Sequence, residues 1–131
     1  MKLLLDTHIW LWSDAEAHKL TSKVARELAN PENERYLSAV SVWEAILLLE
    51  KERIRPKGDF GQWFEKSKLE LGLIEVPLNW EIAHEIRSTI LGYRDPADRF
   101  LVATAKVYDL TLVTADERLL GVRGIRVLAN R

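Results

Sequence analysis

The chain has 131 residues, of which 47% are hydrophobic and 30% charged, a balance typical of a globular domain with a real core, and we expect one domain spanning residues 1–131. The absence of cysteine excludes disulfides, thiolate nucleophiles and zinc–thiolate sites, and it agrees with a reducing cytoplasm. The net charge is −1, so any binding of nucleic acid must come from a local patch.

Short apolar runs alternate with amphipathic stretches along the chain. We predict strands over residues 3–5, 36–39, 73–76, 111–114 and 125–128. The predicted helices are a short one after Asp6 and others over about 21–30, 41–53, 59–71, 79–92 and 95–109. Strands that alternate with helices imply right-handed crossovers and a parallel sheet covered on both faces. We therefore predict a three-layer α/β/α domain.

The ends of the chain and its histidines exclude several classes of protein. Only one lysine and three leucines precede Asp6, which is too short for a signal-peptide core, and no segment is long enough to span a bilayer. His8, His18 and His84 show no metal-ligand spacing. We expect a soluble, cytoplasmic protein that makes no membrane contact.

Acidic residues recur where strands end and helices begin. Asp6 follows the first strand in "LLLDTH", Glu44 lies in the first turn of the helix in "LSAVSVWEA", and Asp116 follows "LVT". Asp95 and Asp98 open the helix that precedes the fourth strand. Because the carboxyl ends of parallel strands share one edge of the sheet, these side chains can converge there.

Most of these acids also have a structural interpretation. Ser41 and Glu44 fit a capping box, in which each side chain satisfies a backbone group of the same helix end. Asp95 matches an N-cap and can pair with Arg99 four residues on. Asp98 is harder to explain in this way, because the apolar face of "FLVATA" follows it at once. Both interpretations stay open at the level of single residues.

A cluster of acids has a chemical consequence that single caps do not have. Neighbouring carboxylates raise one another's pKa unless a cation lies among them. Mg²⁺ prefers oxygen ligands, keeps several waters and commonly joins a few carboxylates to substrate phosphates. Such an ion lowers the pKa of a bound water and polarises phosphoryl oxygens, so the cluster favours phosphodiester chemistry.

Four segments resemble the PIN-domain ribonucleases, and within them the VapC toxins of bacterial and archaeal toxin–antitoxin pairs. These segments are "LLLDTHIWLW", "LSAVSVWEAILLLEKERI", "YRDPADRFLVATA" and "LVTADERLL", in the family's order and over almost the whole chain. The resemblance implies a five-stranded sheet of order 3-2-1-4-5 and an Mg²⁺- or Mn²⁺-dependent endoribonuclease that inhibits translation. It also implies a homodimer and a cognate antitoxin.

The resemblance further assigns site residues and a substrate. It implies that the catalytic and metal-binding acids are Asp6, Glu44, Asp98 and Asp116. We expect Asp95 and Arg99 to support this site. The expected substrate is RNA, such as tRNA or another structured RNA.

Two other functions stay open beside the ribonuclease. An aspartyl-phosphate phosphatase or receiver domain also carries acids at the ends of parallel strands, although a dehalogenase-type phosphatase would have aspartate where His8 stands. A receiver would also need a later active-site lysine. The second alternative is a non-catalytic protein-binding module on the same fold. Metal-dependent cleavage of RNA that is lost in Asp6→Asn separates all three.

The tryptophans are expected to serve mainly in core packing. Trp10 and Trp12 cannot both face one side of a helix, so one of the two is expected to be exposed. A dimer or antitoxin surface is its expected destination.

Overall fold

A computed structural model describes residues 1–131 and contains a five-stranded parallel sheet of order β3-β2-β1-β4-β5. The strands are β1 (Lys2–Leu5), β2 (Glu34–Ser38), β3 (Leu73–Val76), β4 (Thr111–Thr114) and β5 (Arg126–Ala129). The α-helices are α1 (Thr7–Ala15), α2 (Ser22–Ala29), α3 (Ala39–Glu50), α4 (Phe60–Leu71), α5 (Trp80–Glu85) and α6 (Pro96–Tyr108). Three short 3₁₀ helices are η1 (Ala17–Lys19), η2 (Ile86–Ser88) and η3 (Glu117–Leu119). The predicted sheet order and α/β class are confirmed.

Strand β1 lies at the centre of the sheet because its leucines are buried on both faces. Leu4 pairs with Tyr36 of β2 on one side and with Leu112 of β4 on the other. Side chains of a strand alternate between faces, so Leu3 and Leu5 join one core and Leu4 joins the other. A continuous apolar run is the pattern expected of a strand that helices cover on both sides.

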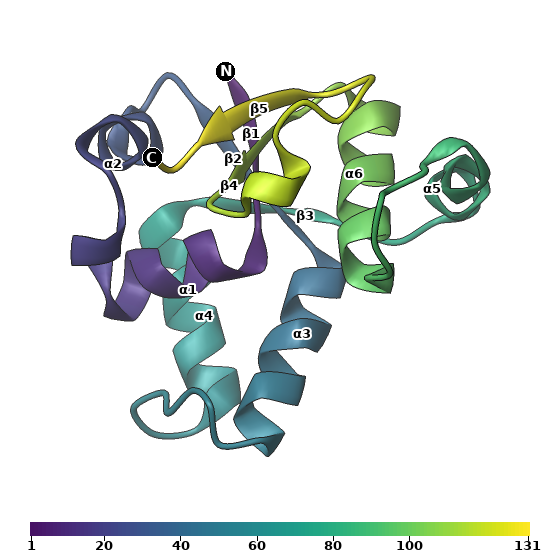
Figure 1. The fold of residues 1–131 in the computed structure, drawn as a ribbon. Helices are drawn as coiled ribbons and strands as arrows, with labels where there is room; N and C mark the ends of the chain where they lie inside the picture. The colour runs from purple at the N-terminus through teal and green to yellow at the C-terminus, as the bar shows by residue number, and fades with distance from the viewer.

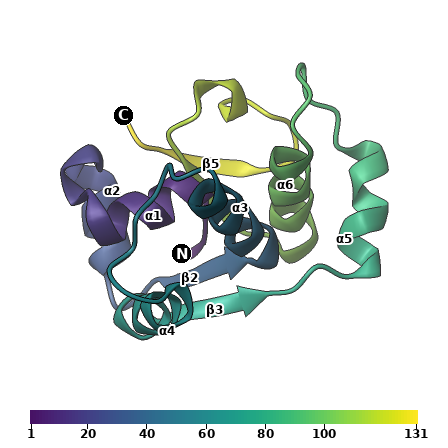
Figure 2. The ribbon, with the colours of Figure 1, turned by 90° about the horizontal axis from the view of Figure 1, so that it is seen from below.

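The helices form the two outer layers (Figure 2). Helices α1, α2 and α4 lie on one side of the sheet, and α5 and α6 lie on the other. Trp10 of α1 is fully buried in the first core, where its Nε1 donates to Ser67 Oγ of α4 at 2.9 Å. Leu101 and Val102 of α6 are fully buried in the second core. None of the helices combines the length and apolar character needed to cross a membrane.

Two predicted helices differ from those observed. Helix α3 begins at Ala39 rather than at Ser41, because Ser38 is its N-cap and accepts the N–H of Val40 at 3.0 Å. The helix predicted over 79–92 is shorter, since α5 ends at Glu85 and continues only through η2. Helices α2 and α4 follow the N-caps Thr21 and Asp59, and the N-cap predicted at Asp95 is confirmed for α6.

One edge of the sheet collects the starts of several helices (Figure 1). Helices α1 and α3 both leave the carboxyl ends of their strands at the lower edge in this view. Helix α6 runs in the opposite direction to the strands, so its first turn also lies at this edge. Asp6 is the N-cap of α1, and Asp98 lies in the first turn of α6. Glu44 lies in the first half of α3. The fold thus directs acids from separate elements to one place.

Candidate active site

Asp6 is fixed between the end of β1 and the start of α1. Its Oδ1 accepts the N–H of Thr7 at 2.7 Å, which caps the helix. Its Oδ2 accepts the hydroxyl of Thr114, at the end of β4, at 2.6 Å. Burial raises the pKa of Asp6, while these two hydrogen bonds oppose the rise. The carboxylate is therefore oriented firmly but disfavoured in its charged form.

Glu44 does not form the expected capping box. Because the N-cap of α3 is Ser38 rather than Ser41, Ser41 and Glu44 lie inside the helix. Glu44 Oε1 instead accepts the hydroxyl of Thr7 at 2.5 Å, and that hydroxyl lies 2.9 Å from Ser41 Oγ. Burial raises the pKa of Glu44 most, and the charges of Asp6 and Asp95 raise it further. Glu44 thus faces the other acids rather than its own helix end.

Asp98 is less exposed than Asp6 and Glu44. Only 7% of the residue is exposed, and its Oδ2 accepts the hydroxyl of Tyr93 at 2.7 Å. Burial is the main cause that raises the pKa of Asp98 to about 7, and neighbouring carboxylates add to it. Asp95 caps the same helix by accepting the N–H of Asp98 at 3.2 Å. The expectation that Asp95 is an N-cap is confirmed.

Asp116 differs from the other three acids because it forms an ion pair with an arginine of the same chain. The Nη2 of Arg118 lies 2.8 Å from Asp116 Oδ2, and the Nε lies 3.1 Å from Oδ1. These hydrogen bonds to Arg118 are the main reason why the pKa of Asp116 is lowered. The guanidinium carbon of Arg118 also lies 4.0 Å from the centroid of the Tyr93 ring. A chain of contacts therefore runs from Asp116 through Arg118 and Tyr93 to Asp98.

The four predicted acids line a single cleft of about 330 Å³. Its lining residues are Asp6, His8, Trp12, Glu44, Asp95, Asp98, Ala115, Asp116 and Arg118. The convergence expected from parallel-strand topology is therefore present. Trp12 is the partly exposed tryptophan of its pair, and it lies in the wall of this cleft.

The donor set fits a hard divalent cation, although no metal centre is preformed. No three histidine, aspartate or glutamate side chains are grouped so that they would hold an ion as they stand. Each carboxylate instead accepts hydrogen bonds from protein groups such as Thr7, Thr114, Tyr93 and Arg118. The cleft nevertheless offers carboxylate oxygens and no sulfur ligand. The carboxyl groups of Asp6, Glu44 and Asp98 each have a raised pKa that a nearby cation would lower.

Arg99 does not form the predicted pair with Asp95. Its Nη2 donates to the carbonyl of Ile86 at 2.8 Å, and its Nε donates to the carbonyl of Thr89 at 3.1 Å. It is absent from the lining of the cleft and instead ties η2 and the residue after it to α6. The arginine of the cleft is Arg118, which the sequence interpretation missed.

The missed groups have recognisable sequence signals. Arg118 stands two residues after Asp116 in "TADERLL", within reach of a carboxylate at a strand end. Thr7 follows Asp6 directly, and Thr114 ends the strand that precedes Asp116. Hydroxyl residues beside acids of this kind are candidates for orienting ligands through hydrogen bonds.

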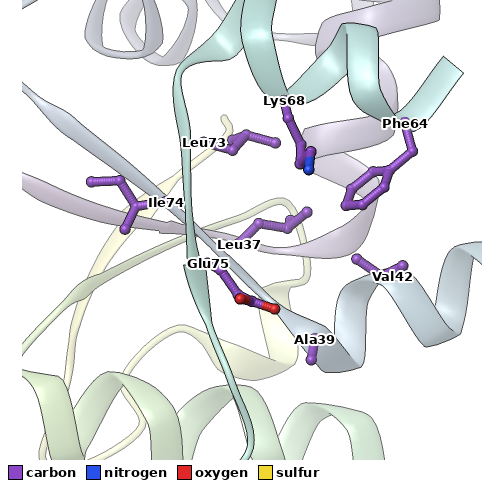
Figure 3. A pocket seen from close by; sticks show the side chains of 8 residues that line it. All are labelled: Leu37, Ala39, Val42, Phe64, Lys68, Leu73, Ile74 and Glu75. Carbon is purple, nitrogen blue, oxygen red and sulfur yellow. The ribbon is translucent and has the colours of Figure 1, made fainter. Parts of the chain in front are cut away.

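A second hollow, of about 230 Å³, has a different chemistry (Figure 3). It lies where β2 and β3 meet α3 and α4, and six of its eight lining residues are hydrophobic. Those lining residues are Leu37, Ala39, Val42, Phe64, Lys68, Leu73, Ile74 and Glu75. With one carboxylate it lacks the donors of a metal site, so the acidic cleft is the candidate active site.

Comparison with known proteins identifies the class that this fold and cleft define. Residues 3–125 match the model of the PIN domain, and the chain belongs to the PIN-domain family. Within that family it is 32% identical to Ribonuclease VapC22 of Mycobacterium tuberculosis over 118 residues. This match covers 89% of this chain and 88% of the relative. The resemblance to VapC toxins is thereby confirmed.

Solved structures share the fold over the whole chain. VapBC2 from Rickettsia felis, bound to a DNA fragment from its promoter, matches with a TM-score of 0.71 at 15% identity and covers 98% of both chains. DNA-bound VapBC from Salmonella typhimurium matches with a TM-score of 0.71 at 17% identity, over 100% of this chain and 99% of that one. A toxin–antitoxin complex from Klebsiella pneumoniae gives a TM-score of 0.66 at 20% identity, over 98% of both chains. At these identities the likeness concerns the fold.

Proposed function

We propose that this protein is a metal-dependent endoribonuclease, the toxin of a VapBC-type pair, which hydrolyses RNA phosphodiester bonds and so inhibits translation. The observation that carries the proposal is the cleft in which Asp6, Glu44, Asp98 and Asp116 meet from separate elements. The similarity to Ribonuclease VapC22 supports the same activity. The proposed RNA substrate is tRNA or another structured RNA.

The four acids are proposed to hold Mg²⁺ or Mn²⁺, directly or through water. When bound, the ion supplies Lewis acidity that lowers the pKa of a water and neutralises charge on the phosphodiester. The hydroxyls of Thr7 and Thr114 orient Glu44 and Asp6 from behind. Asp95 supports the site by capping α6, which sets the position of Asp98.

The chemistry of the products tests this proposal. Incubation of RNA with the protein and Mg²⁺ or Mn²⁺ should give 5′-phosphate and 3′-hydroxyl ends, because water attacks and the 3′ oxygen leaves. A 2′-deoxy substitution at the cut site should leave cleavage intact where binding tolerates it, and EDTA should stop the reaction. Cleavage that persists in EDTA and yields 2′,3′-cyclic phosphate would overturn the mechanism.

The phosphatase, receiver and binding-module alternatives have less support. A receiver needs an active-site lysine, and none lines the cleft. A binding module does not need three fully or partly buried acids whose pKa values are raised by burial, because each one weakens the fold in its charged form. RNA cleavage that depends on both metal and Asp6 is the outcome that only the nuclease predicts.

The proposed protein partner is a cognate antitoxin that docks an apolar segment in the hollow of Figure 3. The toxin–antitoxin complexes among the structural neighbours support such a partner. Val42 lines this hollow, is only partly buried, and lies on the same side of β3 as Leu37 and Phe64 in Figure 3, so Val42→Glu should weaken the complex with the product of an adjacent antitoxin gene. Leu69→Glu is the matched control, because Leu69 is 82% exposed and lies outside the hollow. Equal binding by both variants would place the antitoxin elsewhere.

The homodimer implied by the resemblance also stays a prediction. Light scattering or sedimentation of the isolated protein measures it directly. A mass corresponding to twice 15.1 kDa is the expected result.

A further inference from the structure

A cationic hollow adjoins the acidic cleft. It has a volume of about 400 Å³ and lies between the segment from Ser88 to Gly92 and the residues after η3. Its cationic lining residues are Lys106, Arg118 and Arg123, and it contains no carboxylate. The acidic cleft, by contrast, is lined by five acids. Arg118 lines both, so it stands at the border between the two.

The other two cations of this hollow are arranged differently. Arg123 is exposed and forms neither a hydrogen bond nor an ion pair with any residue of the chain. The Nζ of Lys106 lies 3.3 Å from the carbonyl of Ser88 and 4.0 Å from Glu85 Oε1, so its charge is partly compensated. A charged group without a protein partner at the rim of a cleft is available for a ligand of opposite charge.

Arg118 keeps donors free while it holds Asp116. Its contacts with Asp116 use the Nε–H and one hydrogen of Nη2, which leaves three of the five guanidinium N–H donors unused. The side chain is 58% exposed, and the Tyr93 ring fixes the guanidinium plane from one side. The free donors can therefore bind an anion without giving up the ion pair.

We propose that Arg118 binds a backbone phosphate of the RNA strand beside the bond that is cut, and that Arg123 and Lys106 continue this contact through the cationic hollow. The inference rests on the proposed function, because RNA is the polyanion that the cleft would process. It explains how a polyanion is held next to five acids: the attractive charges lie immediately beside the repulsive ones.

Binding of RNA in EDTA tests the proposal apart from cleavage. Fluorescence anisotropy of a labelled single-stranded RNA, at low salt and without metal, measures Kd for the whole protein. Arg118→Ala and Arg123→Ala should each raise Kd, Arg118→Ala by about tenfold, and each should make the salt dependence of log Kd shallower by about 0.7. Arg118→Lys should retain the salt dependence but only part of the affinity, because it keeps the charge and loses the planar fork.

Arg126 provides the matched control. Its Nη2 lies 3.1 Å from Asp109 Oδ1 and its side chain is 62% exposed, so it is also an exposed arginine in an ion pair. It begins β5 and therefore lies at the opposite edge of the sheet from the cleft. Arg126→Ala should leave Kd unchanged.

The outcomes separate this inference from the proposed function. Equal Kd values for Arg118→Ala, Arg123→Ala and Arg126→Ala would overturn the phosphate contact even if the wild type cleaves RNA. Loss of affinity in the first two alone supports the contact even if no cleavage is found, in which case the proposed function fails by itself. Absence of RNA binding by the wild type at low salt would overturn the inference.

Discussion

The inner wall and the rim of the cleft hold their carboxylates in opposite ways. On the inner wall, Asp6, Glu44 and Asp98 accept hydroxyl groups and have no cationic partner in the chain, so burial raises the pKa of each. At the rim, Asp116 is bound to Arg118 and its pKa is lowered. The acid at the rim is thus neutralised by an arginine of the chain, whereas the three acids of the inner wall have no such partner.

This contrast explains why hydroxyl groups, rather than basic groups, lie behind the inner acids. A lysine or arginine there would remove the repulsion but would also compete with any metal for the same oxygens. A hydroxyl fixes the orientation of a carboxylate while leaving its charge uncompensated. The three inner acids are therefore oriented without being neutralised, whereas Asp116 at the rim is neutralised by Arg118.

Asp6→Asn should produce the largest effect. Removing this acid should lower RNA cleavage by more than about 10²-fold, since loss of an outer-shell partner alone costs 10- to 100-fold. The variant should be at least as stable as the wild type in EDTA, because it removes a buried charge whose pKa is raised. Steady-state cleavage and thermal melting in EDTA measure the two effects. A variant that loses activity together with stability would show that Asp6 serves the fold.

Glu44→Gln separates a ligand from a structural residue. Because Ser38 caps α3, glutamine at position 44 should leave helix content and melting nearly unchanged. Cleavage should nevertheless be lost, since an amide supplies no negative charge to a cation. Circular dichroism and a cleavage assay measure the two effects. Wild-type activity in this variant would remove Glu44 from the proposed ligand set.

The sequence predicts more of this cleft than of its surroundings. Asp6, Asp98 and Asp116 could be located because each follows a strand or opens a helix, and strand ends of a parallel sheet share an edge. The start of α3 could not be located in this way, because serine is a good N-cap at both position 38 and position 41. Strand β2 ends at Ser38, and this places the N-cap there. Local spacing alone favoured the wrong serine.

The two arginines show a second limit of the sequence. Arg99 and Arg118 each lie close to an acid in the chain, and spacing favours Arg99 because it stands four residues after Asp95 on one helix. In the structure, Arg99 donates hydrogen bonds to the carbonyls of Ile86 in η2 and of Thr89, so it does not face the cleft. The position of that turn depends on tertiary packing, so no local pattern reveals which arginine faces the acids.

Thr7→Val tests the role of the hydroxyl groups behind the inner acids. Valine keeps the shape of threonine but cannot donate to Glu44, so cleavage should fall by about 10- to 100-fold. Thr7→Ser should restore most of the activity, because it keeps the hydroxyl. The comparison is made by measuring cleavage at several Mg²⁺ concentrations, and a shift of half-maximal activity to higher Mg²⁺ in Thr7→Val is the specific sign of a mispositioned ligand. If Thr7→Ser were as inactive as Thr7→Val, packing rather than the hydroxyl would be responsible.

The smallest expected effect is a change of stability with pH in the metal-free protein. The pKa of Asp98 is about 7 in the folded state and near 3.8 when unfolded, so the folded state binds more protons between these values. Stability from this group is therefore complete below about pH 4 and is lost as pH rises through about 7. Asp6 and Glu44, whose pKa values are also raised, act in the same direction.

Melting temperatures in EDTA between pH 4.5 and 7.5 measure this loss, and Asp98→Asn should reduce the slope. Saturating Mg²⁺ or Mn²⁺ should reverse the loss at pH 7.5, by about 2.7 kcal/mol at 100 times Kd if the unfolded chain does not bind. The order of these effects follows from the contrast between wall and rim, because the acids without a cationic partner gain most from an added ion. A melting temperature that rises with pH in EDTA, or that ignores both ions at millimolar concentration, would show that the inner acids are already neutralised within the chain.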